Sequence, residues 1–315
     1  MFQVGELPDP EPGPGEVRVR LALSGVNPGD TKKRAGWLGS AMPFPRVVPH
    51  SDGAGRIDAV GAGVEPGRLG ERVWVFGAQS YRAFGTAAEC TVVPAALAVK
   101  LPPQVPEELG ATLGIPGVTA HRAVFADGPV AGRTVLVQGV RGAVSSLAAQ
   151  LARWAGATVI GTVRRSTELD AVPVGSADYT VALDDDPVAA VRRLAPSGVD
   201  HIVEVALHAN ADFDDAVAAQ GAVIAAYASD RERTEVPFWT LLFNNVVLRL
   251  VGSDDVPAEA KQQAARDLTT AAATGALQVR TATPFSLEEI AAAHDAVDAG
   301  ASAGRVLIRL EQATA

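Results

Sequence analysis

The hydrophobic pattern of the chain is most regular over residues 134–165. It opens with a β-branched and apolar run, Thr134–Val137, that has the composition of a buried parallel strand. Apolar residues then recur at helical spacing over 144–152, and Gly156 stands where helices often end in a left-handed residue. A second β-type run, Thr158–Val163, follows. The pattern predicts a βαβ unit, in which a dinucleotide pyrophosphate lies at the helix N-terminus.

Further apolar runs of strand length follow at regular spacing. They cover residues 178–181, 199–206, 221–228 and 246–252, with helical patterns such as 186–194 and 212–219 between them. Six strands alternating with helices predict an α/β fold with a doubly wound parallel sheet in the order 3-2-1-4-5-6. The carboxyl ends of these strands would meet at one crevice, where such folds hold the cofactor. The last strand would form an edge of the sheet.

The pattern on either side of this region is different. Residues 16–23 alternate as a half-buried strand, and residues 43–75 carry short β signals broken by Gly and Pro, which is typical of a compact β-barrel module. A helix is predicted over 257–274, and a last strand over 304–310 is expected to return to the barrel. We therefore assign residues 1–111 and 256–315 to a barrel-type catalytic domain and residues 112–255 to a nucleotide-binding domain.

Composition narrows the possible partners. The chain has 315 residues, and its 27 basic against 36 acidic residues give a net charge of −9, which disfavours nucleic acid or an anionic membrane as a general partner. The sequence contains no apolar run of bilayer length and no signal-peptide pattern at its start, so we expect a cytoplasmic protein. The single cysteine, Cys90, permits neither an internal disulfide nor a cysteine cluster for zinc.

The glycine loop and the end of the second strand carry the candidate chemistry. Gly139 and Gly142 lie between strand and helix, where missing side chains let backbone N–H groups approach phosphates, although a plain crossover would also explain them. Arg164 and Arg165 follow the second strand, where an NAD site would place an acidic residue. Guanidinium groups suit the 2′-phosphate of NADPH, the alternative being a solvated pair of arginines. We predict NADPH as the cofactor.

Six ordered motifs resemble those of the medium-chain dehydrogenases/reductases. Besides the 134–165 unit, they are GVNPGDTKKRAG (25–36), PHSDGAGRIDAVGAGV (49–64), GERVWVFG (70–77), GIPGVTAHRAV (114–124) and the segment 285–310. The chain is most similar to the zinc-free quinone oxidoreductases of the zeta-crystallin type. The resemblance implies a GroES-like catalytic domain and a Rossmann domain, with the nicotinamide between them.

The resemblance also bears on zinc. Zinc-dependent relatives have a cysteine ligand where this chain has Asn27, and a His-Glu pair where it has Ser51 and Asp52. His50 is adjacent to this pair and is expected to stand alone. Since zinc needs three or four ligands at defined geometry, no metal site is expected.

The resemblance implies a cofactor site that follows the carboxyl edge of the sheet and is completed from the catalytic domain. Its residues would be Gly139, Arg141, Gly142, Ala143 and Val144 at the pyrophosphate; Thr162, Arg164 and Arg165 at the adenosine ribose and its phosphate; Leu207, His208, Tyr227, Ala228 and Ser229 along the crevice; and Val251, Gly252, Ser253, Asn27, Thr119 and Arg305 toward the nicotinamide.

Two departures from the family pattern concern the chemistry. Ser145 replaces the usual third glycine of the loop, and Lys32 replaces a tyrosine common beside the nicotinamide. The family's usual first strand is also not evident before Glu16. Lys32 is the one candidate, and a weak one, for donating a proton to a substrate carbonyl, because a solvated lysine in a KKR run explains it better.

The sequence thus predicts an NADPH-dependent oxidoreductase that reduces a quinone or an activated alkene by hydride transfer without zinc. One alternative is an enoyl-thioester or biosynthetic enone reductase on the same scaffold. Another is an NADPH-binding protein with little catalysis, suggested by Ser145 and Lys32. We expect a small-molecule substrate and a homodimer formed through the edge strand over 246–252.

Overall fold

The computed structural model describes residues 2–39, 42–173, 175–300 and 304–310, and the chain forms two compact units. Unit 1 comprises Met1–Val118 and Lys261–Ala315, and unit 2 comprises Thr119–Ala260. The divisions lie after Val118 and Ala260, where the sequence pattern had suggested junctions after residues 111 and 255.

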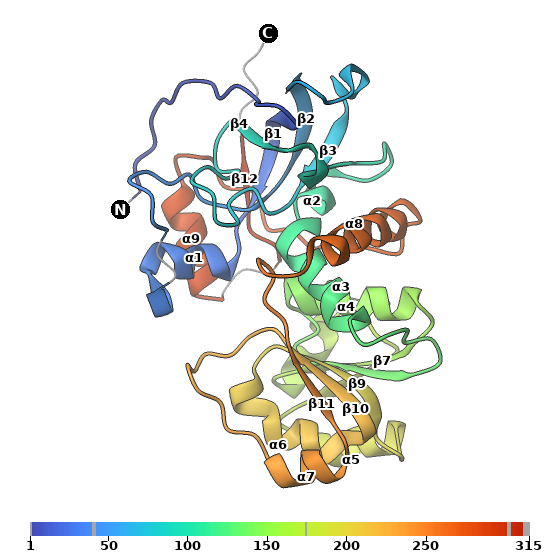
Figure 1. Ribbon diagram of the computed structural model, residues 1–315. Helices are drawn as coiled ribbons and strands as arrows, with labels where there is room; N and C mark the ends of the chain where they lie inside the picture. The colour runs from blue at the N-terminus through green and yellow to red at the C-terminus, as the bar shows by residue number, and fades with distance from the viewer. Residues whose placement is uncertain (1, 40–41, 174, 301–303, 311–315) are drawn as a thin grey trace. The chain divides into compact units, whose positions relative to one another are not determined.

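Unit 1 is built on a six-stranded antiparallel sheet in the order β12-β1-β2-β3-β5, with β4 also paired to β1. In Figure 1, β1, β2 and β3 run side by side in blue to cyan, with the red β12 beside β1. The pairing of β12 with β1 confirms that the last strand returns to this module. The strands are β1 (Glu16–Gly25), β2 (Asp52–Val60), β3 (Arg72–Val75), β4 (Cys90–Pro94), β5 (Ala98–Lys100) and β12 (Leu307–Arg309).

Strand β1 organises the core of unit 1. Its side chains alternate between buried and half-buried, as the sequence pattern predicts, so that Val17, Val19 and Leu21 all point into the core. Trp74 of β3 is fully buried, and its indole N–H donates to Thr269 at 3.2 Å. The helices of this unit are α1 (Pro28–Ala35), α2 (Glu107–Gly110), α8 (Ala258–Ala273), whose first three residues fall in unit 2, and α9 (Ile290–Asp298).

Helix α1 occupies a stretch for which the hydrophobic pattern predicted no helix. Asn27 is its N-cap residue and Pro28 takes the first helical position, where the missing N–H costs nothing. Asp30 lies in the first turn, three basic residues lie in the last turn, and Gly36 ends the helix with a φ of 66°. These start and stop signals are strong, but the Gly-Val-Asn-Pro-Gly run around them also suits a turn.

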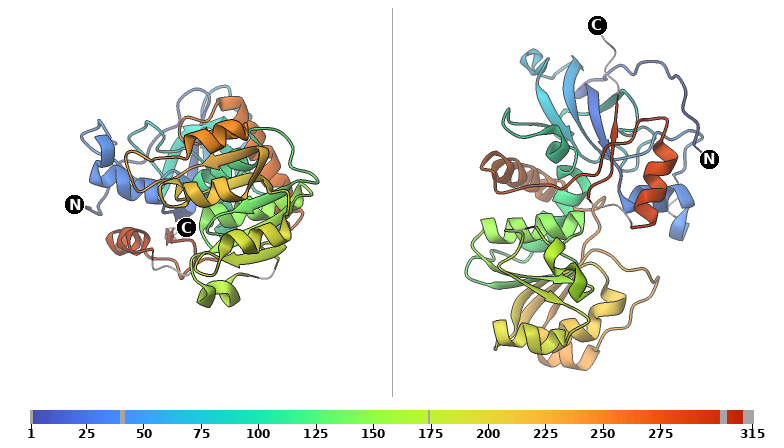
Figure 2. Two further views of the ribbon diagram at one scale, coloured as in Figure 1. Left: turned by 90° about the horizontal axis from the view of Figure 1, so that it is seen from below. Right: turned by 180° about the vertical axis from the view of Figure 1, so that it is seen from behind.

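Unit 2 is a six-stranded parallel sheet in the order β11-β10-β9-β6-β7-β8, which confirms the predicted 3-2-1-4-5-6 order. Helices lie over both of its faces (Figure 2). Its strands are β6 (Thr134–Val137), β7 (Thr158–Val163), β8 (Tyr179–Ala182), β9 (Val199–Glu204), β10 (Ala218–Ala226) and β11 (Val247–Leu250). Its helices are α3 (Val118–Phe125), α4 (Ala143–Trp154), α5 (Pro187–Leu194), α6 (Leu207–Val217) and α7 (Phe238–Phe243).

A single row of branched side chains crosses the middle of this sheet. Leu136 is in register with Ile160 on one side and Ile202 on the other, and Ile202 is in register with Ile224. All four are at most 1% exposed. Burial on both faces is the property of parallel strands that made β6, β7, β9 and β10 readable from composition. Within the described residues, no helix combines the length and apolarity that crossing a membrane requires.

Candidate functional site

The loop after β6 forms the centre of the candidate site in unit 2. Gly139 has a φ of 63°, a left-handed conformation that a residue with a side chain adopts only with strain. Gly142 is the N-cap residue of α4 and provides no side chain to cap the helix. The N–H groups of the first turn, which begins with Ala143 and Val144, are therefore suited to bind an anion.

Buried polar side chains hold this loop from behind. The hydroxyl of Thr162, on β7, accepts a hydrogen bond from the Gly139 N–H at 3.0 Å and donates to Gln138 Oε1 at 2.6 Å. Gln138 in turn donates to Asp214 Oδ1 at 2.8 Å. Thr162, predicted to lie near the ribose, is itself fully buried. Its hydroxyl therefore positions the loop.

Ser145 fits the place of the usual third glycine by making two hydrogen bonds. It is fully buried, and its hydroxyl donates to the Gln138 carbonyl at 2.7 Å. Because that proton is committed, the Tyr227 hydroxyl donates to Ser145 Oγ, 2.8 Å away. Burial raises the pKa of Tyr227 above its usual value. Tyr227 thus acts as a neutral donor that fastens the end of β10 to the first turn of α4.

A pair of buried carboxyl groups, not predicted from the sequence, lies next to this network. Glu204 ends β9, and Asp214 lies on α6; both are fully buried. Burial raises the pKa of each group, and the Glu204 charge raises that of Asp214 further. The signal was available, since Asn210, which donates to Glu204, and Asp214 are four residues apart on one helical face.

Charged side chains gather at the end of β7. Arg164 and Arg165, predicted to bind the 2′-phosphate, are both exposed. Their backbone N–H groups donate to Glu168 Oε2 at 3.1 and 3.2 Å, and Arg141 of the glycine loop donates to Glu168 Oε1 at 2.9 Å. The structure thus brings the three predicted arginines around a carboxylate that the sequence analysis did not single out.

The other predicted residues of unit 2 lie after the remaining strands, except Thr119, which is buried in α3. Leu207 begins α6, and its N–H donates to the Ala228 carbonyl at 3.4 Å. His208 accepts from the Asp230 N–H at 3.2 Å, and Ser229 donates to the Arg231 carbonyl at 3.1 Å. Val251, Gly252 and Ser253 follow β11. Because these strands are parallel, the predicted loops meet at the carboxyl edge of one sheet.

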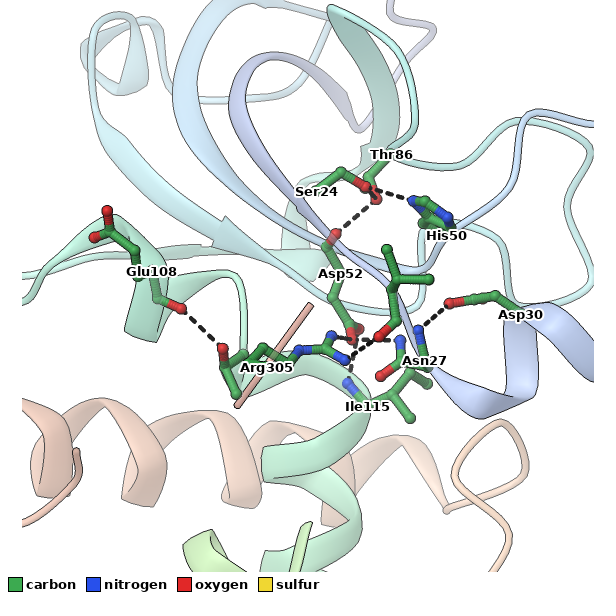
Figure 3. A network of polar contacts seen from close by, with 11 residues as sticks. Ser24, Asn27, Asp30, His50, Asp52, Thr86, Glu108, Ile115 and Arg305 are labelled. Carbon is green, nitrogen blue, oxygen red and sulfur yellow. Dashed lines mark hydrogen bonds and ion pairs between the residues drawn. The ribbon is translucent and has the colours of Figure 1, made fainter. Parts of the chain in front are cut away.

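In unit 1, the carboxylate of Asp52 connects residues that are far apart in the sequence (Figure 3). It is fully buried and accepts from Asn27 Nδ2 at 2.8 Å, from Arg305 Nη2 at 3.1 Å and from the Ile115 N–H at 2.7 Å. Arg305 also donates to the Val26 carbonyl. Asn27 and Arg305, predicted separately, are therefore held on one anion, and the amide of Asn27 is oriented with its nitrogen toward Asp52.

Two glycines make room for this ion pair. A Cβ atom on Gly25 would collide with the Arg305 guanidinium, and one on Gly114 would collide with the Asp52 carboxylate. Next to the pair, Asp30 accepts a hydrogen bond from the Asn27 N–H at 2.7 Å. Burial and the nearby Asp52 charge raise the pKa of Asp30 to about 7.

His50 does not stand alone, contrary to the expectation from the sequence. Its Nε2 lies 2.9 Å from Nε2 of His294, a buried residue of α9. Hydrogen bonds run from the Asp52 carbonyl through Thr86 and Ser24 to His50, and the first of them sets the direction of the others. Thr86 donates to the Asp52 carbonyl and so accepts from Ser24. Ser24 then accepts from His50 Nδ1, which leaves His50 Nε2 to accept from His294. Both imidazoles are neutral in this arrangement, and burial lowers the pKa of each.

Lys32, the candidate proton donor, lies in the last turn of α1. Its ammonium group is 4.4 Å from the centre of the Trp37 ring, a cation–π distance. This contact holds Lys32 beside an aromatic side chain that is 40% exposed. In the part of the chain that the structure describes, no three His, Cys, Asp or Glu side chains are grouped so that they could hold a metal ion.

The histidine pair predicts a loss of stability in acid. Burial lowers the pKa of His294 to about 4, against 6.5 when exposed. The contribution of this residue to the free energy of unfolding is therefore fully present above pH 6.5 and is lost as the pH falls toward 4. We expect the free energy of unfolding to fall by up to about 3 kcal/mol over this interval. Urea titrations should give a shallower fall for His294→Gln than for the wild type. Equal slopes in the two proteins would refute the assignment.

Comparisons with known proteins agree with this architecture. Residues 13–103 match a family model described as the alcohol dehydrogenase GroES-like domain, and residues 143–269 match one described as zinc-binding dehydrogenase. The first match falls within unit 1 and the second mostly within unit 2. The mixed α/β chain therefore combines a GroES-like domain with a Rossmann-like parallel sheet.

Individual relatives are similar over almost the whole chain. A quinone oxidoreductase from Homo sapiens is 28% identical over 302 residues, which covers 94% of this chain and 89% of the relative. The crystal structure of an alcohol dehydrogenase superfamily protein from Novosphingobium aromaticivorans has a TM-score of 0.88 at 26% identity and covers 99% and 96% of the two chains. A mycobacterial structure complexed with NADPH has a TM-score of 0.81 at 26% identity, covering 97% and 95%.

Proposed function

The chain belongs to the medium-chain dehydrogenase/reductase family, of the quinone oxidoreductase type, and from this premise we propose that it transfers a hydride from NADPH to a quinone or an activated alkene without zinc. The observation that carries the proposal is the uncapped N-terminus of α4 behind Gly142, with arginines at the end of β7. The first can bind a pyrophosphate and the second a 2′-phosphate.

The fit of the cofactor rests on residues whose positions are already fixed. Thr162, Gln138 and Ser145 hold the loop and the first turn of α4 from behind, so binding a dinucleotide requires little ordering of the protein. NADPH would supply the hydride, and the chain contributes orientation and charge. A reduced quinone spreads charge over its oxygens and can take its protons from water. An enone gains more from a nearby donor, for which Lys32 is the candidate.

The surroundings of Asp52 support a reaction without zinc. Its two carboxylate oxygens accept from an amide nitrogen, a backbone N–H and the Arg305 guanidinium. A divalent cation at this carboxylate would have to displace the arginine cation, and Asn27 turns its nitrogen, which cannot ligate a metal, toward the same group. The two alternatives from the sequence, an enoyl-thioester or enone reductase and an NADPH-binding protein with little catalysis, are decided by turnover.

The activity predicts a specific pattern across substrates. Absorbance of the reduced nicotinamide should fall with time when NADPH is mixed with the protein and a simple quinone or an α,β-unsaturated ketone. Overnight treatment with a chelator followed by desalting should leave this rate unchanged. Turnover of an enoyl thioester alone would favour the first alternative, and NADPH binding without oxidation of any substrate would favour the second. Loss of activity with the chelator, restored by zinc, would refute the metal-free reaction.

The arginine pair predicts the choice of cofactor. In the double variant with Arg164→Ala and Arg165→Ala, the dissociation constant for NADPH should rise about 10- to 100-fold, because charge-assisted contacts to the 2′-phosphate are lost. Binding of NADH should change much less. Arg193→Ala, an exposed arginine of α5, is the control for a general loss of positive charge. Fluorescence titration with both cofactors measures this, and equal weakening of NADPH and NADH would contradict the prediction.

We also propose that a second copy of the chain covers β11. This strand ends the order of the sheet, and its N–H and C=O groups on the outer side offer an edge for pairing. Residues on both of its faces are exposed: Val247 at 43% on one face, and Leu248 at 39% and Leu250 at 73% on the other. The adjacent α7 exposes Trp239 at 67% and Phe243 at 71%, with their rings stacked. Two such edges related by a two-fold axis would be self-complementary.

Light scattering tests the dimer. The wild-type chain is expected to have twice the mass of one chain at micromolar concentration, and Leu250→Lys should shift it to the monomer because a charge would be buried in the interface. Tyr179→Lys is the matched control, since Tyr179 is 49% exposed on β8 at the other edge of the same sheet. A wild-type protein with the mass of one chain would refute the proposal.

A further inference from the structure

The carboxylate of Glu168 occupies the position of an anion among the arginines at the end of β7. Three donors converge on it: the Arg141 guanidinium at 2.9 Å and the backbone N–H groups of Arg164 and Arg165 at 3.1 and 3.2 Å. These donors come from two elements, the glycine loop and the end of the second strand. The side chain of Glu168 is 27% exposed, so the ion pair with Arg141 is partly shielded from water.

The position of this carboxylate in the fold suits a role in cofactor recognition. In dinucleotide-binding folds, an acidic side chain near the end of the second strand accepts from the ribose hydroxyls, whereas an arginine there accommodates a 2′-phosphate. This chain has both types of residue in one cluster. The carboxylate and a 2′-phosphate require the same donors and carry charges of the same sign, so they compete for one position.

We propose that Glu168 determines the selectivity between NADPH and NADH, by holding the donors that the 2′-phosphate needs. NADPH then binds by displacing the Glu168 carboxylate from Arg141 and from the Arg164 and Arg165 N–H groups. NADH, with a hydroxyl in place of the phosphate, binds with the carboxylate in position, where it accepts from the ribose. Glu168 thereby weakens the preference for NADPH that the arginines create.

A purely structural role for Glu168 would have a different signature. Glu168 also bonds back to the start of the short helix η5 (Ser166–Ala171), an arrangement known as a capping box. If capping were its only role, Glu168→Gln would be nearly neutral for ligands, because the amide oxygen can accept the same backbone hydrogen bonds. In the proposed role, Glu168→Gln removes the competing charge and frees the Arg141 guanidinium while η5 stays capped.

The inference rests on the proposed cofactor site, and the probes are chosen so that a failure of the Glu168 role can be told from a failure of the cofactor site. Calorimetric titrations would use adenosine 2′,5′-bisphosphate and adenosine 5′-monophosphate, which differ only in the 2′-phosphate. In Glu168→Gln, the 2′,5′-bisphosphate should bind about tenfold tighter, the size of one charge-assisted contact. Binding of the 5′-monophosphate should stay the same or weaken. The ratio of the two dissociation constants is the readout.

A matched variant controls for the general effect of removing a negative charge. Asp184→Asn makes the same charge change nearby, since the Asp184 carboxylate accepts from the Ser166 N–H at 2.8 Å. The ratio for Asp184→Asn should equal that of the wild type. An unchanged ratio in Glu168→Gln, or an equal change in both variants, would overturn the role of Glu168 and leave the cofactor site intact. If neither probe bound the wild-type protein, the proposed function itself would fail.

Discussion

The buried ion pair between Asp52 and Arg305 is the interaction on which unit 1 depends. It joins the start of β2 to the segment before β12, and through Asn27 and the Ile115 N–H it also fixes the start of α1 and the kinked turn that contains Gly114. Removing one partner of such a pair costs about 3–5 kcal/mol, because the other charge is left buried without compensation. The pair therefore restricts the surrounding backbone to one arrangement, and glycine at positions 25 and 114 is the condition for it.

In unit 2, mostly neutral side chains hold the glycine loop after β6 in place. A loop that offers its backbone N–H groups to a ligand cannot use them to hold itself in place, so other atoms must do so. Thr162, Gln138 and Ser145 supply these atoms, and Gln138 is itself anchored by a hydrogen bond to the buried Asp214 carboxyl group. The result in both units is similar. Side chains that never need to touch a ligand determine where the groups that could touch one are placed.

The sequence predicted the parts of this protein that depend on local pattern. The strands of unit 2, their order and the glycine loop after the first of them follow from composition and spacing, because burial on both faces of a parallel sheet leaves a clear apolar signature. Helix α1 was missed because the Asn27–Pro28 pair suits a turn as well as a helix start. Contacts between distant residues left no periodic trace: His50 with His294, and Asp52 with Arg305, become visible only when the strands pair. Glu168 was overlooked because a search for positive charge passes over the carboxylate among the arginines.

The pairing of β12 with β1 also has a consequence for the order in which the protein is made. The N-terminal part of unit 1 is synthesised before unit 2, but the end of β1, Leu23–Gly25, keeps one side unpaired and Asp52 lacks its arginine until residues 305–309 have been synthesised. Unit 2 is contiguous in sequence and can complete its sheet while the ribosome is still translating the C-terminal segment of unit 1. Synthesis of unit 1 thus begins before that of unit 2 and ends after it. During that interval, the unpaired edge of β1 and the unpaired charge of Asp52 are the parts of the nascent chain most in need of protection.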